Sequence, residues 1–594
     1  MSYRRKKLLA LFCATALSMT AVAGCTGTKS STGNVVSSET ETNAEETSAQ
    51  SEAGTFSSAD MFTERDLAGT YEESGAVYVT LSDDGIAGET DGVVIDGQMV
   101  TITAEGTYIF SGTLSEGQIV VDADNAKVQI VFDNVDITCA SSAAVYVKSA
   151  EKVFVTLAEG SQNTLRNTDE YVAIDDNNID AVIFAKSDLT LNGTGSLTII
   201  SAEGHGIVSK DDLKIIGGTY DITAAGHALS GKDSVRIADG TFILTAEKDG
   251  IHAENADDEE KGYIYIADGD FTITSDGDGM DASNIVQIED GTLDITAGGG
   301  AANSLKTHES DVPGGPGGGM PQNGEKLDGE SMPQMGEKPD GENMPQDTTT
   351  DESGTSTKGI KAGGGMYLNG GTYQIDSADD SIHSNANITI ADGTYTLATG
   401  DDGVHADDAL IVNGGTITVT ESYEGLEGLT VTINDGTIDI TASDDGINTA
   451  GEKMELNGGY IHILAGGDGV DSNGDLTING GEIYIDGPSD NGNSAIDYGD
   501  RSSAYVNGGT LVAIGSSGMA EGMSDSSKQK VLMVKLGEQM EAGNVVLTDS
   551  EGNVIVSYTA LKTYDCVIIS TAEVESGATY TLTTSGTTTE VTAE

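Results

Sequence analysis

The chain has 594 residues, and 97 acidic side chains against 28 basic ones give it a formal net charge of −69 at pH 7. A charge this negative argues against nucleic acid or an anionic membrane surface as a direct partner, because like charges repel. Hydrophobic residues make up 37% of the chain, which is enough for a folded core, and the absence of tryptophan disfavours a flat aromatic binding platform.

The first segment predicts an export signal. Four basic residues at positions 4–7 precede an apolar run from Leu8 to about Ala23, which is too short and too rich in small residues for a spanning helix. The run ends in Val-Ala-Gly-Cys at Cys25, which resembles the bacterial lipobox, although an ordinary signal peptide could carry a cysteine there. We expect residues 1–24 to be a lipoprotein signal peptide, and lipid on Cys25 to anchor an extracytoplasmic, surface-exposed protein to the cell membrane.

Residues 25–65 are rich in Ser, Thr, Glu and Ala, which predicts a solvated tether. Beyond the anchor the mature chain retains only Cys139 and Cys566, so no disulfide framework is expected.

A glycine turn recurs about every 22 residues through the body of the chain. The last glycine of each turn is Gly218, Gly240, Gly269, Gly291, Gly371, Gly393, Gly415, Gly436, Gly459, Gly481 and Gly509. Three short runs of alternating apolar and polar residues accompany each turn, and helical periodicity is missing. Three strands per repeat at a fixed period predict an all-β parallel solenoid with a continuous core.

The repeat also predicts the boundaries. We expect solenoid over 66–306 and 358–525, and a small β cap or domain over 526–594, where the period is lost. Gly291 and Gly371 are 80 residues apart, and the Gly-, Pro- and Met-rich segment between them predicts a disordered insertion at 307–357.

One turn position is repeatedly asparagine, and we expect a side-chain hydrogen-bonded ladder there with no functional role. These residues are Asn369, Asn413, Asn457, Asn479 and Asn507.

Acidic residues recur nine positions after most turn glycines, and an acidic residue, histidine or asparagine stands twelve positions after them, on either side of an apolar residue that is expected to point inward. By this count Gly300 and Asn303 fill one repeat, and Asp490 and Asn493 fill the last. Stacked carboxylates about 5 Å apart repel by roughly 1 kcal/mol per pair in water and by several times more near a protein surface. The side chains therefore either splay into water or share cations.

Oxygen ligands without thiols favour several bound Ca²⁺ ions. The alternatives are aspartates that only form turns, and a transition metal at His383 and His405. The candidate metal ligands are Asp249, Asp276, Asp278, Asp281, Asp379, Asp380, Asp401, Asp402, Glu424, Glu427, Asp444, Asp445, Asp468 and Asp471.

Basic residues interrupt the acidic rows at one place. Lys358 and Lys361 fall at the two outward positions, and Lys306 fits the second position one repeat earlier if three extra residues are allowed. They either relieve charge or form a cationic subsite for a sugar carboxylate. A lysine with a lowered pKa could also act as the base of a lyase.

The repeat pattern, the Asp-Asp-Gly-Val-His element at 401–405 and the segment Glu-Ser-Tyr-Glu-Gly-Leu-Glu-Gly at 421–428 resemble the clostridial carbohydrate-binding β-helix lipoprotein family over about residues 80–520. The resemblance implies a right-handed parallel β-helix, similar to polysaccharide lyases, that binds Ca²⁺ and cellulosic or acidic pectic polymers. Candidate ligand-binding residues are then Lys306, Lys358, Lys361, His383, His405 and Tyr423.

Three functions remain in competition. The first is a monomeric, surface-anchored, Ca²⁺-dependent polysaccharide-binding protein without catalytic activity, in which Ca²⁺ bridges the acidic rows and sugar carboxylates. The second is a pectate-lyase-like enzyme in which Lys361 or Lys306 abstracts a proton, with Arg501 as a weaker candidate base. The third is a calcium-stiffened structural adhesin.

Overall fold

The computed structural model describes residues 55–306 and 356–593, with the exception of residues 89 and 500. The predicted signal peptide, Cys25 and nearly all of the predicted insertion lie outside the described residues. Strands dominate the described part, and its helical elements are the four-residue α1 (Ser58–Met61) and α2 (Glu64–Leu67) and the 3-10 turn η1 (Ala301–Asn303).

A helix with the length and apolar character needed to cross a bilayer is absent from the part of the chain that the structure describes.

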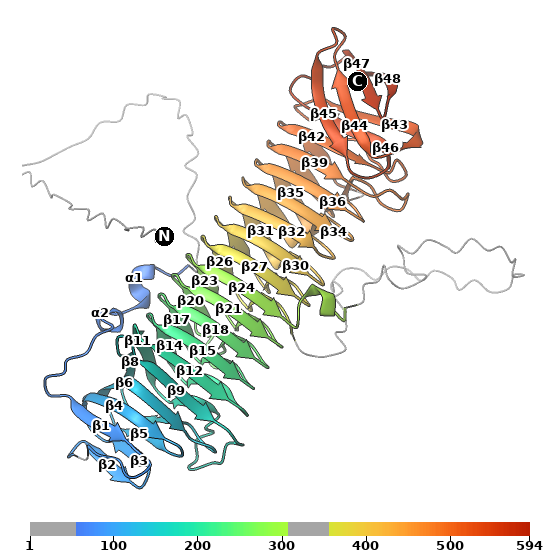
Figure 1. Cartoon of the computed structure of the whole chain (residues 1–594). Coiled ribbons are helices and arrows are strands. Elements are labelled where there is room, and N and C mark those ends of the chain that lie inside the picture. The colour runs from blue at the N-terminus through green and yellow to red at the C-terminus, as the bar shows by residue number, and fades with distance from the viewer. Residues whose placement is uncertain (1–54, 89, 307–355, 500, 594) are drawn as a thin grey trace, which may run out of the picture. The chain divides into compact units, whose positions relative to one another are not determined.

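Each strand of the body pairs in parallel with its counterpart one repeat later (Figure 1). Thr219 pairs with Thr241, which in turn pairs with Asp270. The prediction of an all-β chain with a long, mostly parallel sheet is therefore confirmed. The strands form three rows, which we call the long row, the ladder row and the third row.

The long row consists of β9 (Gln162–Asn167), β12 (Ser196–Ser201), β15 (Thr219–Ala224), β18 (Thr241–Ala246), β21 (Asp270–Ser275), β24 (Thr292–Ala297), β27 (Thr372–Ser377), β30 (Thr394–Thr399), β32 (Thr416–Glu421), β34 (Thr437–Ala442), β36 (Tyr460–Ala465), β39 (Glu482–Asp486) and β42 (Thr510–Gly515).

The ladder row consists of β7 (Val145–Ser149), β10 (Ala181–Ala185), β13 (His205–Ser209), β16 (Leu229–Gly231), β19 (Ile251–Ala253), β22 (Met280–Ala282), β25 (Ile360–Ala362), β28 (Ile382–Ser384), β31 (Val404–Val412), β33 (Leu426–Ile433), β35 (Ile447–Leu456), β37 (Val470–Ser472) and β40 (Ile496–Tyr498).

The third row consists of β8 (Lys152–Leu157), β11 (Asp188–Gly193), β14 (Asp212–Ile215), β17 (Ser234–Ile237), β20 (Tyr263–Ile266), β23 (Val286–Ile288), β26 (Met366–Leu368), β29 (Ile388–Ile390), the second halves of β31, β33 and β35, and then β38 (Asp475–Ile478) and β41 (Ala504–Val506).

The two ends of the body differ from the repeats. The strands before the rows are β1 (Val77–Leu81), β2 (Val93–Asp96), β3 (Met99–Ile102), β4 (Gly106–Leu114), β5 (Gln118–Asp122) and β6 (Lys127–Thr138). After the rows come β43 (Val531–Met540), β44 (Gly543–Thr548), β45 (Val554–Ala560), β46 (Tyr564–Ser570), β47 (Thr579–Thr584) and β48 (Thr587–Thr592). There the pairing becomes antiparallel, since β46 pairs with both β42 and β43, and β45, β44, β47 and β48 form a separate four-stranded sheet.

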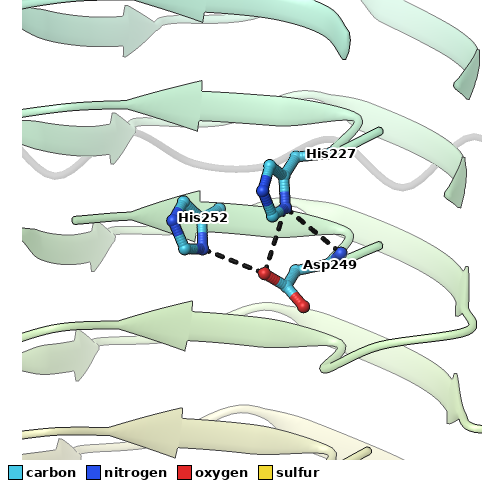
Figure 2. A group of neighbouring side chains, drawn as sticks. All are labelled: His227, Asp249 and His252. Carbon is cyan, nitrogen blue, oxygen red and sulfur yellow. Dashed lines mark hydrogen bonds and ion pairs between the residues drawn. The ribbon is translucent and has the colours of Figure 1, made fainter. Parts of the chain in front are cut away.

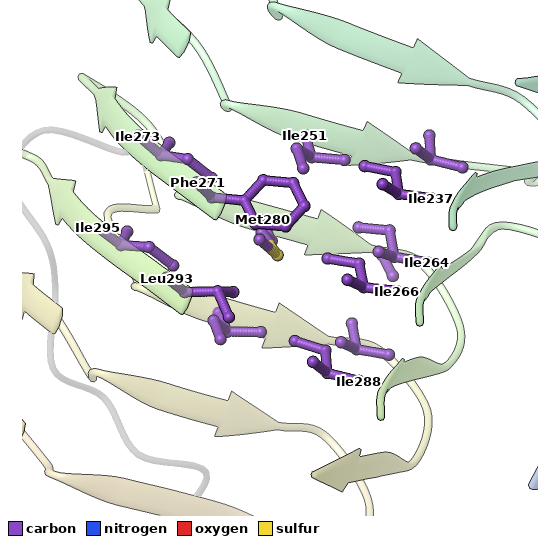
Figure 3. Packing of buried hydrophobic residues seen from close by; sticks show 14 of the residues in the cluster. Ile237, Ile251, Ile264, Ile266, Phe271, Ile273, Met280, Ile288, Leu293 and Ile295 are labelled. Carbon is purple, nitrogen blue, oxygen red and sulfur yellow. The ribbon is translucent and has the colours of Figure 1, made fainter. Parts of the chain in front are cut away.

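The core lies between the three rows. Ile251 of the ladder row, Ile264 of the third row and Ile273 of the long row are each at most 1% exposed, and their neighbours one repeat away continue the same apolar column (Figure 3). Burying a side chain of this size contributes about 1.5–3 kcal/mol, so each added repeat extends the stabilised core.

The turn glycines are required by close packing of successive turns. Gly459 has φ 84°, and a Cβ on it would lie 2.6 Å from the carbonyl oxygen of Gly436. The positive φ and the lack of space both exclude larger residues, which explains why the period is visible in the sequence.

The asparagine ladder is present in the described turns. Asn457 donates through Nδ2 to Oδ1 of Asn434 at 2.9 Å and accepts from Nδ2 of Asn479 at 2.8 Å, and Asn507 donates to Asn479 in the same way. Asn369 departs from this pattern, because it donates to Oε2 of Glu289.

The long step in the repeat leaves strand pairing intact. Leu293 pairs directly with Tyr373, and Asp281 pairs directly with Lys361. Residues 300–306 therefore do not form a repeat of their own. The expectation that Gly300, Asn303 and Lys306 occupy ladder positions is wrong, because adjacent strands leave no room between them.

Candidate functional site

The residue two positions before the inward apolar residue of a ladder-row strand, which we call the ladder residue, accepts a hydrogen bond from the next repeat in most of the row. Asp380 shows the arrangement: its Oδ1 accepts the backbone N–H of Asp402 at 3.1 Å. Its Oδ2 lies 2.6 Å from Nζ of Lys358 and 2.8 Å from Nδ1 of His383. Oδ1 therefore accepts the backbone hydrogen bond from the next repeat, whereas Oδ2 faces cationic side chains.

The same backbone bond recurs along the row. The ladder residues His205, His227, Asp249, Asp278, Asp402, Asp445 and Asp468 accept the N–H of His227, Asp249, Asp278, Lys358, Glu424, Asp468 and Ser494, respectively. Lysine cannot accept a hydrogen bond, so at Lys358 the pattern breaks and the N–H of Asp380 donates to Oδ1 of Asp379 instead. The ladder acids therefore have a structural role whether or not they bind metal.

Two lysines neutralise the acidic group around Asp379. Nζ of Lys306 lies 2.6 Å from Oδ1 of Asp379 and also forms an ion pair with Asp401, and Nζ of Lys358 lies 2.9 Å from Oδ1 of Asp379. Burial alone would lower the pKa of Lys306, but the nearby carboxylates of Asp380, Asp401 and Asp379 outweigh it and raise that pKa. These ammonium groups therefore lie among the predicted metal ligands and stay protonated.

Lys361 has the same relation to Asp278 and Asp281. Its Nζ lies 3.4 Å from Oδ2 of Asp278 and 3.3 Å from Oδ1 of Asp281. Burial lowers the pKa of Lys361, but the two carboxylates raise it by more than burial lowers it, so the net shift is upward. A lyase base needs the opposite shift, so this geometry does not support proton abstraction by Lys361.

Histidine neutralises the next repeat. Nδ1 of His405 lies 2.8 Å from Oδ2 of Asp402 and 2.8 Å from Oε2 of Glu427. Despite burial, bonds to Asp402, Asp407 and Glu427 raise the pKa of His405. An imidazolium therefore faces this pair, while burial and the carboxylate of Asp401 still raise the pKa of Asp402 well above its usual value.

The group formed by Asp445, Asp468 and Asp471 differs from the others. One carboxylate oxygen from each lies within 4.8 Å of the other two. Within the described residues no lysine, arginine or histidine forms an ion pair with any of them. Burial, together with the neighbouring carboxylates Asp444, Asp468 and Asp471, raises the pKa of Asp445 to about 8.

The same causes act on its neighbours. Burial and the carboxylates Asp471, Asp497 and Asp444 raise the pKa of Asp468 to about 7, against the N–H of Ser494. Burial raises the pKa of Asp471 to about 6. Burial also raises the pKa of Asp278 to about 6 and of Asp401 to about 7, so the feature that distinguishes the Asp445 group is its lack of an ion-pair partner in the described residues. A divalent cation with oxygen ligands would supply the missing positive charge.

A further group combines histidine with a carboxylate (Figure 2). Nδ1 of His227 and Nδ1 of His252 lie 3.0 Å and 2.9 Å from Oδ2 of Asp249. The two rings are stacked at 13°, with centroids 4.1 Å apart. His227 stands nine positions after Gly218 and His252 twelve positions after Gly240, so the repeat count reaches both, but neither is among the candidate site residues predicted from the sequence.

Three other predicted residues, Asp276, Glu424 and Tyr423, lie on or next to the ladder row. Asp276 is exposed, and Glu424, whose pKa is raised well above its usual value by burial and by Asp402, accepts a hydrogen bond from Asn448. Tyr423 is partly buried, with its backbone N–H bonded to the carbonyl oxygen of Asp401.

The last repeat was placed wrongly by counting. The N–H that Asp468 accepts belongs to Ser494, and Asp471 pairs with Asp497. The expected pair Asp490 and Asn493 lies in the preceding turn, because this repeat is longer than 22 residues. Counting from the buried Ile496 would have found Ser494 two positions before it and Asp497 one position after it.

The chain belongs to the family of carbohydrate-binding domain-containing proteins, whose model matches residues 96–403 and 401–550. A carbohydrate-binding domain-containing protein of Acetivibrio thermocellus is 40% identical over 139 residues, which cover 23% of this chain and 49% of the relative. The chain thus spans about half the length of that curated relative. A solved structure, the polysaccharide lyase-like protein from C. thermocellum as a gadolinium derivative, is 36% identical and matches 38% of this chain and 92% of its own, with a TM-score of 0.37.

Proposed function

We propose that this chain is a calcium-dependent polysaccharide-binding protein without catalytic activity, built on a right-handed parallel β-helix and held at the cell surface by lipid on Cys25. Its ligand is an acidic, polygalacturonate-like plant polymer, with cellulosic polymers as the second candidate. Family membership supports carbohydrate binding, and the carboxylates support calcium.

The observation that carries the calcium proposal is the contrast along the ladder row. Lysine balances the acids near Asp379 and Asp278, and histidine balances Asp402. The group of Asp445, Asp468 and Asp471 has no such partner in the described residues. We assign the principal Ca²⁺ ion to this group, with the Oδ2 atoms of Asp445 and Asp468 as ligands because their Oδ1 atoms accept backbone N–H groups.

Calcium also makes an acidic ligand compatible with this chain. A polyuronate and a protein of charge −69 repel each other. A Ca²⁺ ion with open coordination positions can take carboxylate oxygens from both, since it accepts six to eight oxygen ligands. The metal and ligand proposals therefore stand together.

Retention on a polymer tests this function. The purified protein is passed over immobilised polygalacturonate in calcium and in chelator, and the eluate is followed for the ultraviolet absorbance of unsaturated product. Retention in calcium that falls in chelator, without product, supports the proposal. Product formation that Lys361→Ala abolishes would establish a lyase instead, and absence of retention on any polysaccharide would favour the adhesin.

Asp468→Asn adds a matched variant. The amide keeps an oxygen that accepts the N–H of Ser494, so the backbone bond survives, but one ligand charge is lost. We expect its retention in calcium to fall to the level that the wild type shows in chelator. Full retention by this variant would remove the Asp445 group from the proposal.

A further inference from the structure

A cleft of about 400 Å³ opens beside the first histidines of the ladder row. Its walls carry three imidazoles and three lysines, an unusual grouping on so acidic a chain. These residues are His205, His227, His252, Lys210, Lys232 and Lys248. Glu254 and Asp257 are the acidic members of its lining.

A backbone bond fixes the tautomer of the first of these imidazoles, because Nδ1 of His205 accepts the N–H of His227 at 2.8 Å. Nδ1 of His227 lies 3.2 Å from the backbone nitrogen of Asp249 and 3.0 Å from Oδ2 of the same residue. A neutral imidazole that accepts at Nδ1 carries its proton on Nε2. Figure 2 shows the second nitrogen of His227 facing away from Asp249. His205 therefore carries an Nε2–H donor, whereas Nε2 of His252 lies 3.4 Å from Oε2 of Glu254.

The lysines add positive charge, part of which faces the carboxyl group of Asp180, since Lys210 and Lys248 both act to lower its pKa against burial. Lys210 lies with Nζ 5.3 Å from the ring centroid of Phe184, and within the described residues neither Lys210 nor Lys248 forms an ion pair. Lys232 pairs with the exposed Asp257 at 2.7 Å. Burial lowers the pKa of His205 to about 3, together with the neighbouring charges of His227, Lys248 and Lys210, and keeps that ring neutral.

We propose that this cleft binds the carboxylate of an acidic sugar unit, with the Nε2–H group of His205 as hydrogen-bond donor and Lys210 and Lys248 as counter-charges. The inference rests on the proposed function and gives it a second, metal-free contact. It also replaces the predicted subsite at Lys306, Lys358 and Lys361, because those ammonium groups are already paired with aspartates.

A metal ion is the competing occupant, since His227, Asp249 and His252 bring three ligand atoms together. Both Nδ1 atoms already face Oδ2 of Asp249, at 3.0 Å and 2.9 Å. The nearby lysines also repel cations and attract anions.

Titration calorimetry in calcium measures the affinity for polygalacturonate and so tests the cleft. The variant is the double substitution Lys210→Gln and Lys248→Gln, and the control is Lys453→Gln, an exposed lysine paired with Glu455 elsewhere on the molecule. We expect the double variant to bind about tenfold more weakly, as expected when charge-assisted bonds are lost, and the control to bind as the wild type does. Fully methyl-esterified polymer should not distinguish the double variant from the wild type.

The outcomes separate the cleft from the wider function. Equal affinity of the double variant and the wild type would overturn the cleft while leaving calcium-dependent binding in place. Failure of the wild type to bind polygalacturonate in calcium would refute the proposed function itself. Binding that is lost after chelation and restored by zinc but not by calcium would assign the cleft to a metal and overturn the carboxylate proposal.

Discussion

The uncompensated charge at Asp468 predicts that removing one carboxylate stabilises the metal-free protein. Asp468→Asn retains the acceptor for the N–H of Ser494 but removes the negative charge. The pKa of Asp468 is raised from 3.8 to about 7, so keeping it ionised above pH 7 costs about 4 kcal/mol, at 1.36 kcal/mol per pKa unit.

Coulomb's law gives a similar magnitude. Two charges 4.8 Å apart repel by about 3.5 kcal/mol at an effective dielectric constant of 20. Part of this cost is already avoided by partial protonation of the group. We therefore expect Asp468→Asn to be about 2–4 kcal/mol more stable than the wild type at pH 8 in chelator.

The assay is thermal and urea unfolding at pH 8, in chelator and in millimolar calcium. Calcium should raise the melting temperature of the wild type, because a cation that binds the folded state at 100 times its Kd adds about 2.7 kcal/mol. It should raise that of Asp468→Asn much less. The variant thus melts higher than the wild type in chelator and gains less from calcium.

Asp380→Asn is the matched control in the same row. Its Oδ1 also accepts a backbone N–H, but its Oδ2 is paired with Lys358 and His383. Breaking a buried ion pair typically costs about 3–5 kcal/mol, so this variant should be destabilised in chelator. The reasoning is refuted if both substitutions shift stability in the same direction, or if calcium stabilises Asp468→Asn as much as the wild type.

Three further outcomes follow from the same structure. In chelator, the wild type should lose stability as pH rises from 5.5 to 8.5. The pKa values of Asp471, Asp468 and Asp445 are raised to about 6, 7 and 8, so over this range the folded state binds more protons than the unfolded state. A urea midpoint that rises with pH over this range would contradict the prediction. Gly459→Ala should cost more than about 1 kcal/mol, measured by unfolding, whereas Gly552→Ala, with similar φ but open space around it, should cost less. Asn457→Ala should cost about 1–2 kcal/mol through its lost ladder bonds, and an unchanged midpoint would show that the ladder is energetically neutral.

The repeat and its core follow from local rules that a sequence displays. Glycine at positions such as Gly459 is imposed by positive φ and by the carbonyl of the previous turn, and inward residues such as Ile273 alternate at the strand period. Both signals recur, so pairing over most of the body was predictable, together with the acidic rows. The count failed wherever a repeat changed length, as at Ser494 and at residues 300–306.

The partners of the acidic rows were not predictable from spacing. Lys306 reaches Asp379 and Asp401, about 70 to 95 residues later in the chain, because the chain re-enters the stack beside the point where it leaves. In each ladder aspartate, the position of the next backbone N–H decides which carboxylate oxygen accepts that bond and which one faces a cation. The cleft residues come from three repeats with different spacings, so no single motif contains them.

Direct pairing of Leu293 with Tyr373 has a consequence for how this chain tolerates change. The repeats on either side meet as neighbours, so the length of sequence between Lys306 and Ser356 is not dictated by the stack. Such a junction accepts segments of very different size without altering the strands around it. We expect exchange of residues 307–355 for a short linker, or for an unrelated folded module, to preserve the fold, which makes this position a natural point for grafting cargo onto the scaffold.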